Sequence, residues 1–135
     1  MSACAYVGSQ THIYNDSLRN NLTLWNEAIT DTHIKEALER VNLLSFLSRI
    51  DEQVSDGSFS EGQKQRIGLI RAFLKGSSVV IFDEATANLD HKNATRIEHL
   101  LLSDPNITYI TVTHHLIKEN EPYFDKIIRL GEGTE

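Results

Sequence analysis

An unbroken apolar run of four residues, 79–82, stands near the middle of the chain and leads directly into two acids, Asp83 and Glu84. A strand buried on both faces is typically a continuous apolar run, whereas a half-buried strand alternates apolar and polar residues. The run therefore predicts a buried parallel β-strand, which requires other strands beside it and helices over it. This segment places the chain in the α/β class.

Shorter β-rich segments fit around that strand. Residues 3–7 form a short apolar run that is expected to end near Gln10. Residues 107–112 form a β-branched run that ends just before His114, and a last short strand is expected over 126–130.

Helical patterns fill most of the chain before the central strand. Asp16 or Ser17 can cap a short helix that continues through Leu24. Longer helices are expected over about 32–50 and, after the central strand, over about 92–102, where apolar residues recur at helical spacing. Their inward positions are predicted to be Ile34, Leu38, Val41, Leu44 and Leu47 in the first and Ala94, Ile97, Leu100 and Leu101 in the second.

The segment 59–66, with the sequence FSEGQKQR, has the features of a helix start, and 76–77 should end that helix. Ser60 is a favoured N-cap, and Gln63 can complete a capping box. Gly62 in the first turn weakens a helix by roughly 0.5–1 kcal/mol relative to alanine, which makes sense where another molecule approaches the backbone. A helix start of this kind suits a phosphate group. An ordinary capped helix that tolerates a glycine is the alternative.

Polar groups follow three of the predicted strands: Gln10 the first, Asp83 and Glu84 the central one, and His114 the next. Open α/β sheets bind ligands at the carboxyl ends of their strands, so these side chains are candidates for one site. Asp83 suits a magnesium ion, and Glu84 suits a base that takes a proton from an attacking water. The alternatives are an exposed acidic pair at a helix start and an ordinary surface or core histidine.

Composition narrows the classes of function. The 135 residues suffice for one domain with one core. A formal net charge of −6 argues against broad nucleic-acid binding. The single cysteine, Cys4, cannot form an internal disulfide, which fits a reducing compartment. No apolar run approaches a membrane span and no signal peptide is recognisable, so any membrane connection is expected through a partner or a further part of the polypeptide.

The order of these motifs is more specific than any one of them. Gln10, a helical insertion, FSEGQ at 59–63, VVIFDE at 79–84, ANLD at 87–90 and His114 follow one another along the chain. This series resembles the nucleotide-binding domain of ATP-binding-cassette (ABC) proteins. In that comparison the motifs match the Q-loop, the signature motif, Walker B with the catalytic glutamate, the D-loop and the switch histidine, and together they span essentially the whole chain.

The resemblance implies a partial P-loop NTPase fold with parallel core strands and an all-helical insertion subdomain. Residues 1–135 would form a single truncated nucleotide-binding domain. About 11–75 would be the helical subdomain with the signature motif, while 1–10 and 76–135 would belong to the RecA-like core.

Finer similarities point to the exporter branch of the family. QTHIYNDSLRNNL at 10–22 is similar to the exporters' sequence after the Q-loop, and VSDG at 54–57 occupies the place of the loop that touches their membrane domains. Residues 125–130 resemble their closing strand. The resemblance thus implies an ATPase at the cytoplasmic face of the membrane, partnered by transmembrane domains and a second nucleotide-binding domain, with no nucleic acid.

Roles for individual residues follow from the same resemblance. Asp83 and Gln10 would hold Mg²⁺ through water, Glu84 would orient and deprotonate the attacking water, and His114 would contact the γ-phosphate of ATP. Asp90 would support the dimer interface.

The signature residues would act on a nucleotide held by another domain. In the family, two nucleotide-binding domains face each other head to tail, and the signature helix of one caps the γ-phosphate held by the other. Ser60, Glu61, Gly62 and Gln63 would therefore bind ATP in trans.

Several positions depart from the family pattern. Phe59 replaces the signature leucine, Glu61 the first of two glycines, Ala87 a frequent D-loop serine, and His115 a frequent exporter arginine. The charge of Glu61 suits the helix dipole, but it would oppose a phosphate if the two pointed the same way.

The largest departure is an absence. Nothing in these 135 residues matches G-x-x-x-x-G-K-[ST], the Walker A loop that cradles phosphates and supplies a lysine. The aromatic residue that stacks on adenine would also lie upstream, and Tyr6 is no substitute because it lies inside the first strand. We therefore expect a fragment or truncated product that exposes an unpaired sheet edge, binds ATP weakly and hydrolyses none.

Two other functions stay open from the sequence. The chain could be a catalytically dead module that pairs with an intact domain and lends its signature helix. It could also be a soluble ABC ATPase acting on DNA, although those carry a long coiled-coil or zinc insertion, and the short insertion here has no cysteine pair.

Overall fold

The computed structural model describes residues 4–8, 10–83 and 89–131. Helices dominate the first half of the chain, whereas strands and helices alternate in the second half. The elements are β1 Cys4–Val7, β2 Asp16–Ser17, α1 Leu18–Thr23, α2 Asp31–Arg40, the 3₁₀ helix η1 Leu44–Arg49, β3 Gln53–Val54, the 3₁₀ helix η2 Asp56–Ser58, α3 Glu61–Lys75, β4 Val79–Asp83, α4 His91–Ser103, β5 Thr108–Val112 and the 3₁₀ helix η4 Lys118–Tyr123.

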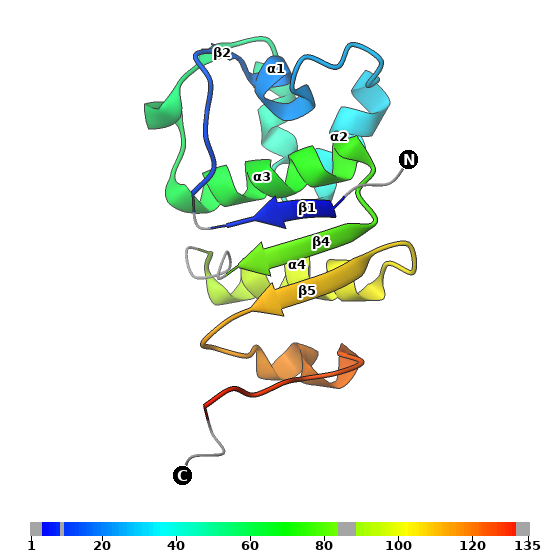
Figure 1. Cartoon of the computed structure of the whole chain (residues 1–135). Coiled ribbons are helices and arrows are strands. Elements are labelled where there is room, and N and C mark those ends of the chain that lie inside the picture. The colour runs from blue at the N-terminus through cyan, green and yellow to red at the C-terminus, as the bar shows by residue number, and fades with distance from the viewer. Residues whose placement is uncertain (1–3, 9, 84–88, 132–135) are drawn as a thin grey trace.

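A parallel sheet is formed by β1, β4 and β5 in that order, and the three arrows point the same way in Figure 1. The register sets Val7 beside Phe82 and Asp83 beside Val112. The central apolar run is therefore a parallel strand with a partner on each side, as its sequence predicts. Parallel pairing brings the carboxyl ends of all three strands to one edge.

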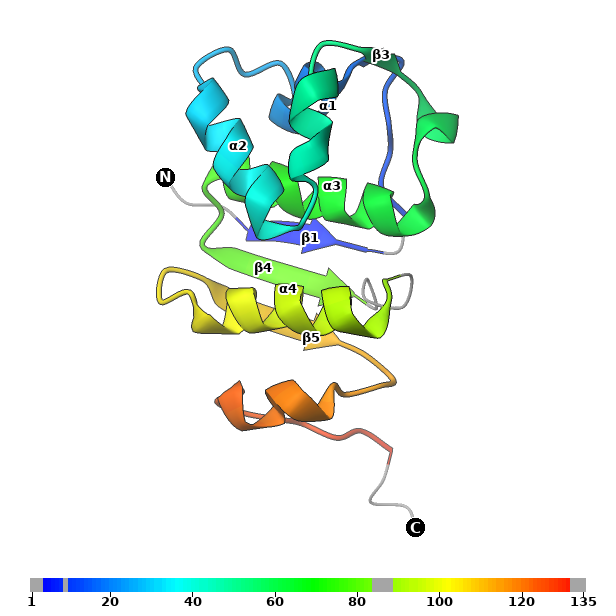
Figure 2. The ribbon, with the colours of Figure 1, turned by 180° about the vertical axis from the view of Figure 1, so that it is seen from behind.

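Helices cover one face of this sheet. On that side α3 packs against β1, and the hydroxyl of Tyr109 in β5 donates a hydrogen bond of 2.7 Å to Glu98 of α4. Val80 and Phe82 of β4 point to the same side as Tyr109 and are fully buried. Figure 2 shows α4 crossing in front of the sheet on this side.

The opposite face is only partly covered, and we call it the open face. Tyr6, Ile110 and Val112 on this side are 64%, 47% and 55% exposed, and Val79 and Ile81 are half-buried. The prediction that the central strand is buried on both faces is therefore wrong for this face. In Figure 1 the open face is turned toward the viewer, with α4 behind the sheet and α3 above it.

The helical region packs on α3 through α1 and α2. The single helix predicted over 32–50 is wrong, because the chain turns after α2 and η1 begins only at Leu44. Asn42 in this turn has a φ of 61°, a left-handed conformation that asparagine visits more readily than most residues. The turn buries Val41 and Leu43 and leaves Leu44 exposed, although Leu44 was predicted to face inward.

Helix ends follow the local sequence signals. The predicted cap at Ser17 is confirmed, since its side chain accepts a hydrogen bond of 3.0 Å from the N–H of Asn20. The predicted end of α3 is also confirmed, with Gly76 at a φ of 75°, where glycine avoids the steric cost of a side chain. Of the inward positions predicted in α4, Leu100 is wrong because it is exposed, while the other three are buried.

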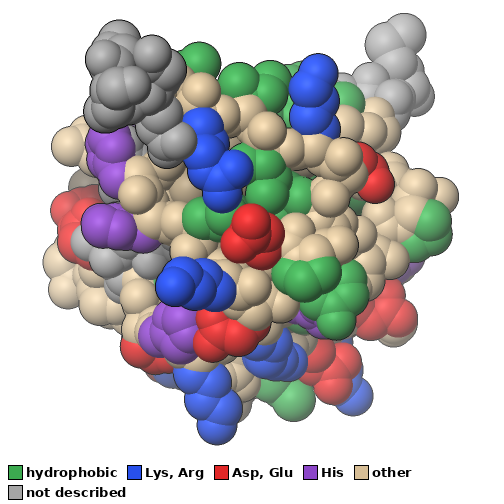
Figure 3. All heavy atoms as spheres, turned by 90° about the horizontal axis from the view of Figure 1, so that it is seen from below, with side chains coloured by type: hydrophobic (Ala, Val, Ile, Leu, Met, Phe, Trp, Pro, Cys, Tyr) green, Lys and Arg blue, Asp and Glu red, His purple; other side chains and the backbone are tan. Residues whose placement is uncertain are grey.

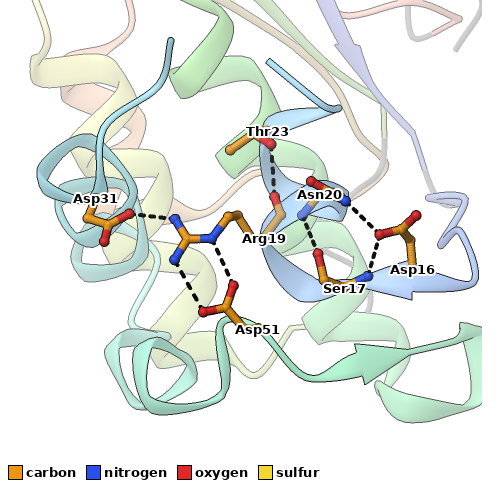
Figure 4. A network of polar contacts seen from close by, with 7 residues as sticks. All are labelled: Asp16, Ser17, Arg19, Asn20, Thr23, Asp31 and Asp51. Carbon is orange, nitrogen blue, oxygen red and sulfur yellow. Dashed lines mark hydrogen bonds and ion pairs between the residues drawn. The ribbon is translucent and has the colours of Figure 1, made fainter. Parts of the chain in front are cut away.

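A charged network holds α1 to its neighbours (Figure 4). Arg19 pairs with Asp31 at the start of α2 at 2.5 Å and with Asp51 after η1 at 2.9 Å. Hydrogen bonds to these carboxylates raise the pKa of Arg19, and the bond from Arg19 holds the pKa of Asp51 below its usual value. Arg19 thus ties together three segments that are separate in sequence.

The strand predicted over 126–130 does not form. Residues 124–131, which we call the C-terminal segment, run back after η4 without regular secondary structure. A cavity of about 640 Å³, lined by residues of both, lies between this segment and β5. Because β5 lies across this cavity, the segment has no strand beside it to pair with among the described residues.

Candidate functional site

Three of the predicted site residues lie at or just beyond the carboxyl edge of the parallel sheet. Asp83 is the last residue of β4, and Val112 beside it ends β5. Gln10 lies three residues beyond the end of β1, and His114 lies two residues beyond the end of β5; both are exposed. The parallel register therefore brings Gln10, Asp83 and His114 to one edge of the sheet.

Asp83 has a partner that sequence reasoning missed. The hydroxyl of Tyr6 donates a hydrogen bond of 2.5 Å to Oδ2 of Asp83. This bond, with burial and the carboxylate charge adding to it, raises the pKa of Tyr6. The signal in the sequence was alternation: in the observed register Tyr6 and Asp83 project from the same face of neighbouring strands. The expectation that Tyr6 lies inside the first strand is confirmed.

The start of α3 forms the capping box that its sequence predicts. The side chain of Ser60 accepts a hydrogen bond of 3.1 Å from the N–H of Gln63, and the side chain of Gln63 accepts one of 3.0 Å from the N–H of Ser60. Gly62 in the first turn is buried. The capping box orders the first turn of α3. It therefore fixes the direction of the positive end of the helix dipole.

Glu61 is balanced by a lysine on its own helix. Nζ of Lys64 lies 3.1 Å from Oε2 of Glu61 and 2.9 Å from Oδ2 of Asp56. These two contacts, Asp56 first, raise the pKa of Lys64, whose side chain is largely buried. Sequence reasoning missed Lys64, although its spacing of three residues from Glu61 is the signal of a helical ion pair.

A pocket links the start of α3 to the segment after β1. Its volume is about 410 Å³, and it is lined by Gln10, Thr11, His12, Asp56, Glu61 and Lys64. The structure thus brings Gln10 and Glu61, which the sequence resemblance assigned to two different motifs, to one hollow. The lysine at its wall offsets the acid that the sequence places there.

Close packing joins the same two segments further along. A methyl group at Gly68 of α3 would lie 3.0 Å from Oγ1 of Thr11 and 3.3 Å from Cγ1 of Val7. Contacts of this length are tighter than ordinary van der Waals packing, so a side chain at position 68 would force the neighbours apart. The glycine therefore permits the segment that follows β1 to lie directly on α3.

Asp90 acts as the N-cap of α4. Its carboxylate accepts hydrogen bonds of 2.8 Å from the N–H and 2.9 Å from Nδ2 of Asn93. These bonds, supported by the positive charge of Arg66 on α3, hold the pKa of Asp90 below its usual value. Asp90 therefore stays ionised at neutral pH beside α3. Glu84 and the D-loop positions 87 and 88 lie outside the described residues.

The oxygen ligands at the sheet edge fit magnesium better than they fit a metal ion whose ligands all come from the protein. The described residues contain no group of three or more acidic, histidine or cysteine side chains that could hold a metal ion. Asp83 offers one carboxylate, and Gln10 offers an amide oxygen from the same edge. Magnesium commonly takes one or two protein carboxylates and completes its shell with waters and phosphate oxygens.

A parallel sheet with polar groups at its carboxyl edge and a glycine-bearing, capped helix start defines the class of nucleotide-binding α/β proteins. The family model described as ABC transporter matches residues 3–87. The chain belongs to the ABC transporter family.

Curated relatives support this assignment. The chain is 33% identical over 135 residues to a probable ABC transporter ATP-binding/permease protein of Haemophilus influenzae, covering 96% of this chain and 24% of that protein. It is 30% identical over 140 residues to the ATP-dependent lipid A-core flippase of Francisella novicida, covering 98% and 23%. The chain therefore spans about a quarter of the length of these relatives.

A solved structure supports the fold. A bacterial Atm1-family ABC exporter with ATP bound matches 84% of this chain and 21% of its own, with a TM-score of 0.75 and 22% identity. The partial P-loop NTPase fold and the likeness to the exporter type that the motifs predicted are confirmed. None of the helices in the described ranges is long and apolar enough to cross a bilayer.

Proposed function

We propose that this chain is the C-terminal part of the ATP-binding, ATP-hydrolysing portion of an ABC exporter, which couples hydrolysis to transport at the cytoplasmic face of a membrane. The observation that carries the proposal is the register of the sheet, which sets the ends of β1, β4 and β5 side by side. Gln10, Asp83 and His114 follow those ends. Transmembrane domains and a second nucleotide-binding domain would be its partners.

Each residue at the edge has a proposed task. Asp83, with Gln10, would hold Mg²⁺ through water, and the ion would supply neutralisation of charge on the phosphates of ATP. Glu84 would orient the attacking water and take its proton. His114 would contact the γ-phosphate. Tyr6 would position Asp83, because its hydroxyl bonds one carboxylate oxygen, Oδ2, and leaves Oδ1 outside that bond.

The start of α3 would serve a nucleotide held by another domain. Ser60, Gly62 and Gln63 would present the helix end to the γ-phosphate in trans, with Glu61 turned toward Lys64 rather than toward the phosphate. Asp90 would support the dimer interface. In this proposal residues 11–75 form the helical subdomain, and 1–10 and 76–135 form the core portion.

The 135-residue chain should bind ATP weakly and hydrolyse none measurably, because no segment of it supplies the phosphate-binding lysine and loop. Titration with labelled ATP and Mg²⁺ tests this directly. A micromolar affinity of the 135-residue chain for ATP would refute the proposal that another part of the protein supplies the phosphate-binding loop. An Asp83→Asn variant is the control, because it removes the carboxylate assigned to the metal.

A second candidate, a catalytically dead module that lends its signature helix, is supported by the intact capping box of α3. Mixing the chain with a separate nucleotide-binding domain that carries a Walker A loop distinguishes the two. If the chain raises the ATP hydrolysis rate of the other domain, the effect should be lost in Ser60→Arg and kept in the matched control Ser45→Arg. That result would favour a chain that lends its signature helix. Ser45 is an exposed serine of η1 and far from α3 in sequence.

A further inference from the structure

Lys64 lies between two carboxylates that come from different elements. Its Nζ is 2.9 Å from Oδ2 of Asp56 in η2 and 3.1 Å from Oε2 of Glu61 at the start of α3. The side chain of Lys64 is only 11% exposed, whereas that of Glu61 is 58% exposed. The buried stem and the contact with Asp56 therefore fix the ammonium group, and the ammonium group sets the direction of the freer Glu61 carboxylate.

Ion pairs between two exposed side chains also occur in the chain, and they differ from this one. Figure 3 shows acidic and basic side chains intermixed on the face seen from the side of the C-terminal segment. Arg129 and Glu121, for example, lie 3.6 Å apart with both side chains about half exposed. Such pairs add little, because water screens them and two long side chains must be ordered. Lys64 is instead buried and held by a second carboxylate, so its position is fixed before it meets Glu61.

The capping box of α3 leaves two backbone N–H groups available at the helix tip. The N–H of Gln63 donates to Oγ of Ser60, the N–H of Ser60 to Oε1 of Gln63, and the N–H of Lys64 to the carbonyl of Ser60. Within the described ranges the N–H groups of Glu61 and Gly62 have no acceptor, as is usual for the first turn of a helix. An anion at the tip would accept hydrogen bonds from these two groups.

The carboxylate of Glu61 is a potential competitor for that position. It belongs to the first residue of the helix, where the helix dipole favours a negative charge, and the same field attracts a phosphate group. A carboxylate turned over the tip would occupy the place of the phosphate and repel it. In the structure the carboxylate contacts Lys64 instead, at the pocket that Gln10 and Asp56 also line.

We infer that Lys64 is a positioning residue, which holds the Glu61 carboxylate away from the tip of α3 and so keeps the tip open to the terminal phosphate of a nucleotide bound by another domain. This inference rests on the proposed action of α3 in trans. Asp56 supports the arrangement by holding Lys64 from the other side. The contacts with Asp56 and Glu61 raise the pKa of Lys64, so the lysine stays charged at neutral pH.

Direct contact between Lys64 and the phosphate is the alternative role. Both roles require the charge of Lys64 as long as Glu61 is ionised. They differ once Glu61 is made neutral, because a lysine that only restrains Glu61 is then dispensable. A lysine that binds the phosphate itself is still required. A second-site substitution therefore separates the two roles, and a purely structural role of Lys64 would not respond to it.

The test uses the 135-residue chain and, as probe, a separate nucleotide-binding domain that carries a Walker A loop. The signature serine of the probe is replaced by arginine to stop the probe from pairing with itself. It is loaded with Mg²⁺ and a non-hydrolysable ATP analogue, or with ADP as the reference that lacks the γ-phosphate. Analytical ultracentrifugation gives the dissociation constant for the chain.

Lys64→Met keeps a side chain of similar length and removes its charge. We expect it to weaken binding to the probe with the ATP analogue at least about tenfold, and to change binding to the probe with ADP little. The double variant Glu61→Gln with Lys64→Met should bind the ATP-analogue probe within about twofold of the wild-type chain, since the repelling charge is gone. Lys35→Met, an exposed lysine of α2, is the matched control and should bind as the wild type does.

Two results would overturn the inference and leave the proposed function in place. One is a Lys64→Met chain that binds as tightly as the wild type, and the other is a double variant that binds as weakly as Lys64→Met. A wild-type chain without preference for the ATP analogue over ADP would overturn the proposed action of α3 in trans, and the inference with it. Should Lys64→Met disturb the circular dichroism spectrum, Lys64→Gln takes its place in both variants.

Discussion

Tyr6 in β1 and Asp83 in β4 are joined by a hydrogen bond of 2.5 Å between the phenol hydroxyl and Oδ2 of the carboxylate. The two residues are 77 positions apart, and only the pairing of the two strands brings them together. The bond occupies one oxygen of the carboxylate assigned to magnesium. Tyr6 therefore sets the orientation of Asp83 before any ligand arrives, which reduces the cost of ordering it later.

This bond should be visible in the titration of Tyr6. Because Asp83 raises the pKa of Tyr6, Asp83→Ala should return that pKa toward the ordinary value of about 10. The ultraviolet absorbance of tyrosinate is followed as the pH rises. The difference from the curve of Tyr6→Phe gives the contribution of Tyr6. An unchanged Tyr6 titration in Asp83→Ala would show that the bond is absent in solution.

The cap of α3 should contribute to stability. Ser60→Ala removes the acceptor for the N–H of Gln63, so we expect the free energy of unfolding to fall by about 1 kcal/mol. Urea unfolding followed by circular dichroism measures this. Ser45→Ala, an exposed serine of η1, should change stability by less than about 0.5 kcal/mol. Equal effects of the two substitutions would contradict the assigned cap.

A buried amide in α3 should be replaceable with a gain in stability. Gln65 is 1% exposed, and among the described residues neither its side-chain oxygen nor its nitrogen has a hydrogen-bond partner. An unsatisfied buried polar group costs on the order of 1–3 kcal/mol, so Gln65→Leu should raise the free energy of unfolding by about 1 kcal/mol. Urea unfolding measures the change.

The matched control is a buried amide that is well bonded. Nδ2 of Asn120 donates hydrogen bonds of 3.1 Å to the carbonyl of Thr95 and to Oε1 of Glu98. Asn120→Leu should therefore lower the free energy of unfolding by about 1–3 kcal/mol, because it leaves those acceptors unpaired. Loss of stability in both variants would mean that Gln65 has a partner that the structure does not hold, such as a buried water.

Acid should weaken the network around Arg19. The pKa of Asp51 is lower in the folded protein than in the unfolded chain, because Arg19 donates a hydrogen bond to its carboxylate. Such a group stabilises the fold above its unfolded pKa of about 4 and loses that contribution as the pH falls through the lower, folded value. Asp51→Asn should therefore show a smaller loss of stability than the wild-type protein below about pH 4.

Urea unfolding across that pH range measures the effect. Glu27→Gln, an exposed acid in the loop before α2, should retain the wild-type dependence. A steeper dependence in Asp51→Asn would have the wrong sign for a carboxyl with a lowered pKa.

Local elements were predictable because their causes lie within one or two turns. Ser60 and Gln63 predicted the start of α3, and Gly76 predicted its end. The apolar run of β4 and its parallel pairing also followed from the sequence. The break at Asn42 was not predictable from periodicity, since the helical spacing continues through it and packing of Val41 and Leu43 decides the turn.

Features that depend on distant partners were harder to predict. Residues 126–130 have a strand composition, but a strand also needs a neighbour, and the cavity of about 640 Å³ separates these residues from β5. The edge that gathers Gln10, Asp83 and His114 could be expected from strand ends alone. The bond from Tyr6 and the ion pairs of Lys64 required the register and the fold of 56–64. The roles of Glu84 and His114 stay predictions.

The contact of Gly68 with Thr11 and Val7 has a mechanical consequence. Packed interiors compress little, and no free space separates these atoms. A displacement of Thr11 toward α3 therefore presses directly on the helix at Gly68, eight residues after its cap Ser60. A load applied to the chain just after β1 thus meets the middle of the helix that begins at Ser60.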